Sequence, residues 1–362
     1  MIINSVIGEI FNVRVICGKM THVRRVAVSS FGVRLLIVMS LSLMCVFTSC
    51  DKADEVDGVE EVDSLYVPAF DLSGVDSVLL KPGLRILAIG NSYTVDFTRM
   101  LSKVVNSVCD DKPDIAFYSL IRGNGSFYDW YNISRGNDTS SYDCRKVIDN
   151  IGMSVQTGTC SGDDNSLLRA VLSEEWDVVV IQQRSLWATE YDMWFGREQP
   201  GYLRDWLSVV RSYQPNAVIA FPVVHSYYSK YKDNVELSSS DRHAKIVRSV
   251  TALFAEKPVF QIVIPYGTAV ELLRETSYNN EYDLTRDGTH LGFGLPCYAA
   301  ACCVYETLLS RRVGKSVSGT SFSYTCPSWE RTSAYPCVDI DEVSARVAQD
   351  CAVSACAPYM LR

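Results

Sequence analysis

Five short apolar segments recur along the chain, each six or seven residues long. Continuous apolar runs of this length are typical of strands that are buried on both faces of a parallel sheet. Parallel strands need long crossover connections, so the intervening segments should form helices that cover the sheet. The predicted strands are RILAIG at 85–90, DIAFYSL at 114–120, DVVVIQ at 177–182, AVIAFP at 217–222 and VFQIVI at 259–264.

The intervening segments place apolar residues three and four positions apart, which is the spacing of one helix face. The alternation predicts an α/β fold of three layers, with a five-stranded parallel sheet between two helical layers. Residues 312–340 are rich in Ser, Thr, Tyr and Cys, and we expect an irregular C-terminal appendage there. The expected helices lie at 95–108, 166–176, 202–213, 243–256 and 294–309.

The N-terminal segment resembles a bacterial lipoprotein signal peptide. An apolar run at 35–47 follows Arg24, Arg25 and Arg34 and leads into FTSC, which ends at Cys50. The run has 13 residues, whereas a span of the bilayer needs about 20. We therefore expect cleavage after residue 49, a lipidated Cys50 and a location in the bacterial cell envelope. An uncleaved anchor helix is the alternative.

The charge balance and residue counts exclude several classes of function. Lys and Arg number 34 against 42 Asp and Glu, and this acidic balance argues against nucleic acid as a partner. The chain has 4 His and no dense cluster of metal ligands, so we expect no metal site. It has neither a Walker loop nor a dinucleotide fingerprint, and no cofactor is expected. An exported chain can oxidise its cysteines, and the pattern favours pairing among Cys326, Cys337, Cys351 and Cys356, with the connectivity open.

Two short segments carry candidate chemistry, one at the end of the first predicted strand and one just before the last helix. Gly90-Asn91-Ser92 follows the first strand, where a tight turn into a helix would expose the Ser92 hydroxyl. Asp287 and His290 are three residues apart just before the last helix, so the carboxylate can hold the imidazole while its other nitrogen faces a serine. The alternatives are an ordinary helix cap and a turn-forming Asp beside a loop histidine.

Polar residues follow two more of the predicted strands. Gln183 ends the third strand and would face Ser92 across the crevice, where its amide could donate to an oxyanion. Gly123 and Gly125 follow the second strand and would let backbone N–H groups approach a substrate. The alternatives are a glutamine that solvates a strand end and an ordinary glycine loop.

These motifs, in this order, resemble the SGNH/GDSL hydrolase superfamily over residues 84–312. An uncharacterised branch of exported bacterial proteins with that fold is similar in three segments, LAIGNSYT, the QQRS block and LTRDGTHL. The resemblance implies a flavodoxin-like sheet of order 2-1-3-4-5, with Ser92 as nucleophile, His290 as base and Asp287 as its orienting acid. It also implies oxyanion donors at Ser92, at Gly123 or Gly125, and at a third block. Asn91 stands in place of the usual Asp and is, with Gln183 and the two glycines, a candidate oxyanion or substrate-binding residue. No Gly-x-Asn-Asp block follows the third strand, so Gln183 is assigned by position.

The sequence as a whole predicts four parts: a signal peptide at 1–49, a lipidated cysteine with an acidic flexible tether at 50–83, a hydrolase-like domain at 84–312 and a Cys-rich extension packed on it at 313–362. The expected function is that of a monomeric, lipid-anchored serine esterase that removes small acyl groups such as acetyl from carbohydrate. A non-catalytic glycan-binding or assembly lipoprotein on the same scaffold is the alternative, and acyl transfer to a sugar hydroxyl is a third possibility.

Overall fold

The computed structural model describes residues 73–111, 114–138, 141–148, 157–160, 165–231, 237–256, 260–331 and 337–360. The expected signal peptide, Cys50 and the tether as far as residue 72 lie outside these residues. Within the described part of the chain, no helix combines the length and the apolar character that a membrane crossing requires.

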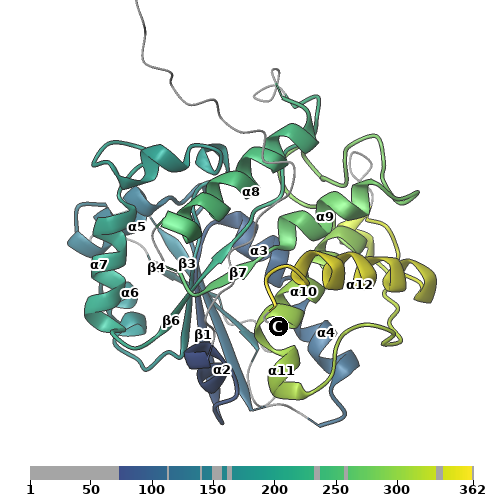
Figure 1. Cartoon of the computed structure of the whole chain (residues 1–362), viewed down its shortest axis with the longest axis horizontal. Helices are drawn as coiled ribbons and strands as arrows, with labels where there is room; N and C mark the ends of the chain where they lie inside the picture. Colours follow the sequence, from purple (N-terminus) through teal and green to yellow (C-terminus); the bar gives the residue numbers. More distant parts are fainter. Residues whose placement is uncertain are drawn as a thin grey trace, which may run out of the picture. The chain divides into compact units, whose positions relative to one another are not determined.

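A twisted sheet forms the middle layer, and the α/β class predicted from the sequence is confirmed (Figure 1). Its strand order is β4-β3-β2-β1-β5-β6-β7. The five predicted strands are parallel and keep the order 2-1-3-4-5. Their bounds are β1 Leu84–Gly90, β2 Ile115–Ile121, β5 Val178–Ile181, β6 Val218–Pro222 and β7 Ile262–Ile264.

The prediction of five strands was wrong, because two antiparallel strands extend the sheet beyond β2. They are β3 (Tyr142–Ile148) and β4 (Thr157–Cys160). Strand β3 has the sequence YDCRKVI, and its five inner residues are only half-buried. A half-buried strand near a sheet edge does not need the continuous apolar run that marks a central parallel strand. Strand β3 was therefore not predicted from the sequence.

Helices cover both faces of the sheet (Figure 1). One layer holds α5 (Phe127–Arg135), α6 (Ser166–Leu172) and α7 (Leu203–Tyr213). The helix predicted at 95–108 is two helices in the structure, α3 (Ser92–Thr98) and α4 (Leu101–Val108). The remaining helices are α8 Ser239–Glu256, α9 Tyr266–Arg274, α10 Leu295–Leu308, α11 Ser310–Val313 and α12 Glu342–Cys356. Helix α8 contacts α9.

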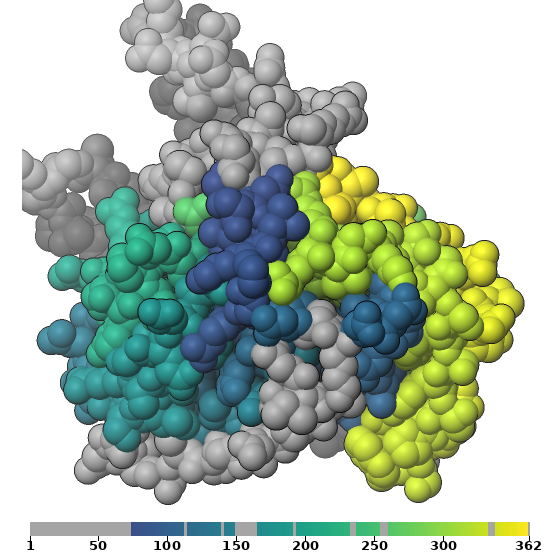
Figure 2. Space-filling model, turned by 90° about the horizontal axis from the view of Figure 1, so that it is seen from below, coloured from purple at the N-terminus to yellow at the C-terminus, as the bar shows by residue number. Residues whose placement is uncertain are grey.

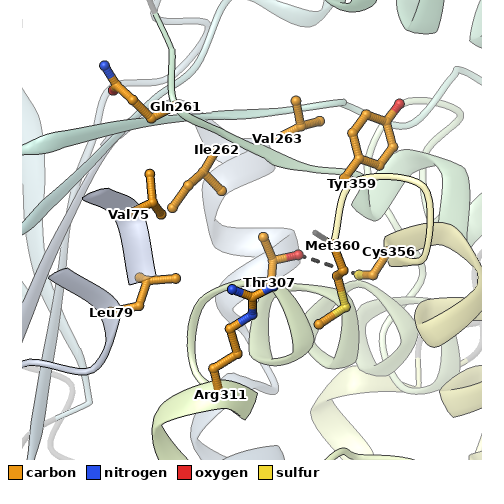
Figure 3. Close-up of a pocket in the computed structure, with 10 residues that line it drawn as sticks. All are labelled: Val75, Leu79, Gln261, Ile262, Val263, Thr307, Arg311, Cys356, Tyr359 and Met360. Carbon is orange, nitrogen blue, oxygen red and sulfur yellow. Dashed lines mark hydrogen bonds between the residues drawn. The ribbon is translucent and has the colours of Figure 1, made fainter. Parts of the chain in front are cut away.

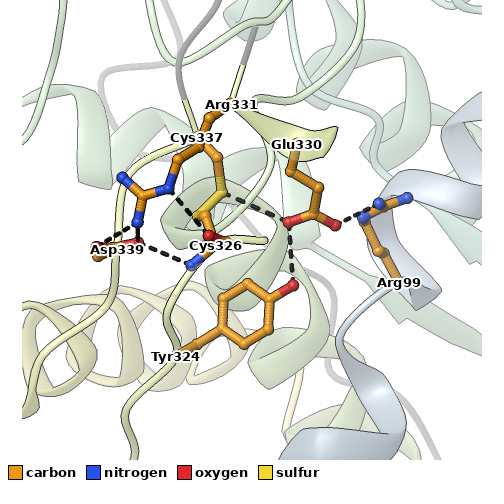
Figure 4. The surroundings of a disulfide bond; sticks show 7 residues. All are labelled: Arg99, Tyr324, Cys326, Glu330, Arg331, Cys337 and Asp339. Carbon is orange, nitrogen blue, oxygen red and sulfur yellow. Dashed lines mark hydrogen bonds and ion pairs between the residues drawn. A yellow bond between two sulfur atoms is a disulfide. The ribbon is translucent and has the colours of Figure 1, made fainter. Parts of the chain in front are cut away.

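The described residues between α11 and α12 are largely irregular, as expected for 312–340, and helix α12 follows them, beyond the range for which irregular structure was predicted. Asp341 and Ser344 form a reciprocal capping box at its start. Helix α12 packs on α9 and α10. This contact explains why α10 is buried on almost every side, since the sheet covers one face and α12 another. Cys326 and Cys337 form a disulfide in the preceding loop (Figure 4), while Cys356 Sγ lies 3.4 Å from Cys303 Sγ.

The tether predicted at 50–83 also needs correction, because residues Ser73–Leu79 form helix α2. Val75 and Leu79 are 4% and 3% exposed, so one face of this short helix belongs to the core. Asp76 pairs with Arg311 of α11, and α2 lies beside α11 at the underside of the domain (Figure 2). Two buried apolar residues at positions i and i+4 are enough to fix one turn of helix. The acid-rich composition of the predicted tether hid this short pattern.

Candidate active site

The described residues bring the predicted serine, histidine and aspartate together at the carboxyl ends of the parallel strands. Ser92 Oγ lies 2.7 Å from His290 Nε2. On the other side of the ring, His290 Nδ1 lies 2.6 Å from Asp287 Oδ2. Both distances are those of hydrogen bonds, and the three side chains form a continuous line. A carboxylate on Nδ1 keeps the proton there and leaves Nε2 free to accept one from the serine.

The turn between β1 and α3 presents Ser92 because Asn91 caps the helix. Asn91 Oδ1 accepts a hydrogen bond from the Tyr93 backbone N–H at 3.0 Å, and Asn91 Nδ2 donates to the Gly125 carbonyl at 3.0 Å. Gly90 precedes the turn, and a Cβ atom there would lie 2.3 Å from Thr94 Oγ1. The turn thus requires glycine, and Ser92 begins α3 at a partly exposed position.

A tight loop fixes Asp287 against His290. Asp287 Oδ1 accepts hydrogen bonds from the backbone N–H groups of Thr289 at 3.0 Å and His290 at 2.7 Å. Gly288 has φ +88°, and a Cβ there would also lie 2.5 Å from the Tyr231 ring. Burial would raise the pKa of Asp287, but hydrogen bonds from His290 and Thr289 outweigh burial and hold that pKa well below its usual range. Asp287 is therefore a carboxylate at neutral pH.

Asp96, one turn after Ser92, ties this loop to the helix that carries the serine. Its carboxylate pairs with Arg286 Nη1 at 2.7 Å and accepts the Leu291 backbone N–H at 3.0 Å. Asp96 is 1% exposed. Burial raises its pKa, and the Arg286 charge opposes this shift. The buried Asp96 carboxylate contacts both ends of the 286–291 loop. Contacts within the protein core, and not contacts at the surface, therefore fix the distance between Ser92 and His290.

Two aromatic residues that the sequence did not assign to the site support the same loop. Tyr93 Oη donates to the Thr289 carbonyl at 2.6 Å, and His225 Nε2 lies 2.7 Å from that oxygen. Because a carbonyl only accepts, His225 carries its proton on Nε2. The two rings stack with centroids 4.1 Å apart. Burial, followed by the Arg274 charge, lowers the pKa of His225 well below its usual value, so this ring is neutral.

Gln183 does not occupy the position predicted for an oxyanion donor. Its Nε2 donates to the Pro200 carbonyl at 2.9 Å, and its Oε1 accepts the Arg184 backbone N–H at 2.8 Å. The neighbouring Gln182 instead reaches the turn, where its Nε2 donates to Asn91 Oδ1 at 2.8 Å. Both glutamine side chains are buried and hold loops in place.

The two predicted loop glycines and Asn91 also do not offer the cavity the donors expected of them. The Gly125 N–H donates to the Arg122 carbonyl at 2.9 Å, which closes a turn. Gly123 is exposed and is not among the residues that line the cavity at Ser92. Asn91 does line that cavity, but its side chain is engaged in the helix cap and with Gly125. Asn124, with φ 55°, lies between the glycines and lines the cavity instead.

A cavity of about 200 Å³ opens beside the serine. By contrast, the cavity between α2, β7 and the C-terminal segment is about 30 Å³, and its lining is mostly apolar (Figure 3). The larger cavity is the only one of the two with a nucleophile and a base in its wall. It is lined by Ser92 and His290 together with Asn124, Arg184, Tyr227 and Tyr231.

The one group of potential metal ligands in the described residues lies elsewhere, in the C-terminal loop. It consists of Cys326, Glu330 and Cys337. The two cysteines are joined in a disulfide, so neither offers a thiolate, and Glu330 accepts hydrogen bonds from Arg99 and Tyr324 (Figure 4). This arrangement is that of a structural cross-link.

Residues 85–326 match the family model of a domain of unknown function, DUF4886. The chain belongs to the DUF4886 family. A crystal structure of a DUF4886 family protein from Bacteroides uniformis shares its fold, with 20% sequence identity, a TM-score of 0.60 and coverage of 77% of this chain and 97% of that one. Axe2, an acetylxylan esterase from Geobacillus stearothermophilus, matches with 15% identity and a TM-score of 0.37 over 66% of this chain and 97% of that one. A search of curated proteins gives no match.

Proposed function

We propose that this DUF4886 protein is an SGNH-type serine esterase. The observation that carries the proposal is the hydrogen-bonded line from Ser92 Oγ through His290 to Asp287 at the wall of a cavity. A protein that only bound a ligand would not need an imidazole nitrogen aimed at a partly exposed serine, with an ionised carboxylate on the opposite nitrogen.

In the proposed reaction, Ser92 Oγ attacks the ester carbonyl while His290 Nε2 takes the hydroxyl proton. His290 then returns that proton to the leaving alcohol, and a water molecule hydrolyses the acyl-enzyme by the same steps. Asp287 stabilises the imidazolium in each half. We assign the oxyanion to the Ser92 backbone N–H at the first position of α3 and to Asn124 across the cavity.

The proposed substrate is a small acyl group, such as acetyl, carried by a carbohydrate. The cavity volume of about 200 Å³ supports a small acyl group, and the polar wall of Asn124, Tyr227 and Tyr231 suits a hydroxyl-rich alcohol. The proposed reaction needs no cofactor.

A fluorophosphonate probe tests the nucleophile directly, because such probes phosphonylate serines that a neighbouring base has activated. We expect the wild-type protein to be labelled at Ser92 and the Ser92→Ala variant to remain unlabelled. Ser185→Ala is the matched control, since Ser185 lines the same cavity but its hydroxyl contacts Tyr227 at 2.9 Å rather than a histidine. Equal labelling of the wild type and Ser92→Ala would contradict the proposal.

We further propose that the protein is exported and anchored in the bacterial cell envelope through a lipid on Cys50. The basic flank, the short apolar run and the FTSC sequence support this location. Cells supplied with an alkyne-tagged fatty acid should label the wild-type chain but not a Cys50→Ser variant, and the variant should leave the membrane fraction. Labelling that survives the substitution would refute the anchor.

A further inference from the structure

Arg184 lies in the wall of the cavity that contains Ser92 and His290. It lies three residues beyond the end of β5, so the predicted block of polar residues at this strand end places a cation in the site, rather than the amide expected from Gln183. The residue is half-buried, so its charge is only partly solvated.

Within the described part of the chain, the Arg184 side chain has no anionic partner. Among the residues that the structure describes, no carboxylate lies within salt-bridge distance of its guanidinium, and no described carboxylate lines the cavity. Other half-buried or buried arginines do have such partners, as Arg99 has Glu330 at 2.5 Å and Arg286 has Asp96 at 2.7 Å. The chain has a net charge of −8, so the positive charge at Arg184 is not explained by a shortage of Asp and Glu residues in the chain.

Neighbouring aromatic residues hold the guanidinium in place. Its Cζ lies 4.9 Å from the centroid of the Trp187 ring, a cation–π contact. Tyr227 lines the same cavity; burial raises the pKa of its phenol, and the Arg184 charge is among those that oppose this rise. A cation fixed on an aromatic face keeps its N–H donors free and loses little freedom when an anion binds.

We propose that the esters cleaved at Ser92 carry an anionic group, a carboxylate being the simplest, that pairs with Arg184. This inference rests on the proposed esterase function. Because the proposed acyl group is small, the charge belongs to the alcohol part of the substrate, as in an acylated acidic sugar. The planar guanidinium suits an oxyanion with two parallel acceptors.

Two esters of the same size and different charge test this pairing: 4-acetoxybenzoate, whose leaving group carries a carboxylate, and 4-acetoxybenzamide, whose leaving group is neutral. We expect Arg184→Gln to lower the ratio of kcat/KM for the charged over the neutral ester by about 10- to 100-fold, the effect of losing one charge-assisted contact. Arg184→Lys should restore part of the ratio. Arg204→Gln is the control, because Arg204 also lies over an aromatic ring, Phe195, but does not line the cavity.

A binding measurement keeps the test independent of turnover. Calorimetry with 4-hydroxybenzoate and 4-hydroxybenzamide, which contain no ester, should show tighter binding of the anion to the wild type and loss of that preference in Arg184→Gln. An unchanged kcat/KM ratio together with unchanged anion binding in Arg184→Gln would overturn the inference. If the ratio is unchanged but Ser92→Ala hydrolyses neither ester, only the role of Arg184 fails. If the wild type hydrolyses neither ester, the esterase proposal fails, and the calorimetry alone decides whether Arg184 binds an anion.

Discussion

Replacing Ser92 with Ala should lower kcat for p-nitrophenyl acetate by about 10⁴-fold or more, because removing the nucleophile of a serine hydrolase leaves only the help of the oxyanion site and of binding. The nearest serine of the cavity cannot take over, since the Ser185 hydroxyl contacts Tyr227 and not His290. KM should change little, because the Ser92 hydroxyl acts in the transition state rather than in substrate binding.

The Ser92→Ala variant should fold normally, so a lower rate would report the loss of the nucleophile and not a loss of folded protein. Ser92 is partly exposed, and the cap of α3 is formed by Asn91 rather than by Ser92. Thermal unfolding of Ser92→Ala should therefore match that of the wild type. Ser185→Ala, measured beside it, should keep most of the activity. Equal hydrolysis by the wild type and Ser92→Ala would refute the esterase proposal.

The parallel core and the serine–histidine line could be predicted from the sequence for a simple physical reason. Continuous apolar runs identify central strands, and the carboxyl ends of parallel strands meet at one edge. Residues that directly follow such strands, such as Ser92, must then lie at that edge. The Asp287 to His290 spacing is equally informative, because a carboxylate three residues before a histidine can bond both the backbone N–H and the ring of that histidine.

The proposed side-chain donor to the oxyanion could not be predicted in the same way, because it depends on where side chains point. Gln182 and Gln183 are adjacent and both buried, yet the first contacts Asn91 and the second Pro200. Successive residues at a strand end face opposite sides, and their sequence does not show which side faces the cavity. Arg184 lies in the QQRS block and Asn124 between the two loop glycines, but neither was assigned a role, because only the loop conformation brings them to the cavity wall.

Two elements at the edge of the fold, β3 and α12, were not predicted from the sequence, for a related reason. Strand β3 is only half-buried, so it lacks the apolar run that identified the central strands. Helix α12 lies next to a Ser- and Tyr-rich loop, and its buried face is built largely from alanine, as at Ala345, Ala348 and Ala352. Small side chains give a weak hydrophobic pattern although they allow the close packing of α12 on α10.

The second large effect is expected for Asp287→Asn, which should lower kcat by about 10³- to 10⁴-fold, as loss of the correct histidine tautomer does in serine proteases. The local hydrogen bonds determine how the new amide must lie. The Oδ1 position accepts the N–H groups of Thr289 and His290 at 3.0 and 2.7 Å, so the amide oxygen has to stay there. The NH₂ group is then forced to face His290 Nδ1, where Asp287 Oδ2 now lies at 2.6 Å.

An NH₂ group at this place donates to Nδ1 and so moves the imidazole proton to Nε2, where it blocks transfer from Ser92. The loop itself should stay in place, because Asp96 and Gly288 hold it independently of the substituted group. The loss should therefore appear in kcat, with KM and the melting temperature close to those of the wild type. Asp110→Asn is the control, since that exposed carboxylate pairs with Lys315 and does not line the cavity. A drop of less than about 10-fold in kcat for Asp287→Asn would mean that the carboxylate does not set the tautomer, and His290 would then have to be oriented by Thr289, whose Oγ1 lies 3.2 Å from Nδ1.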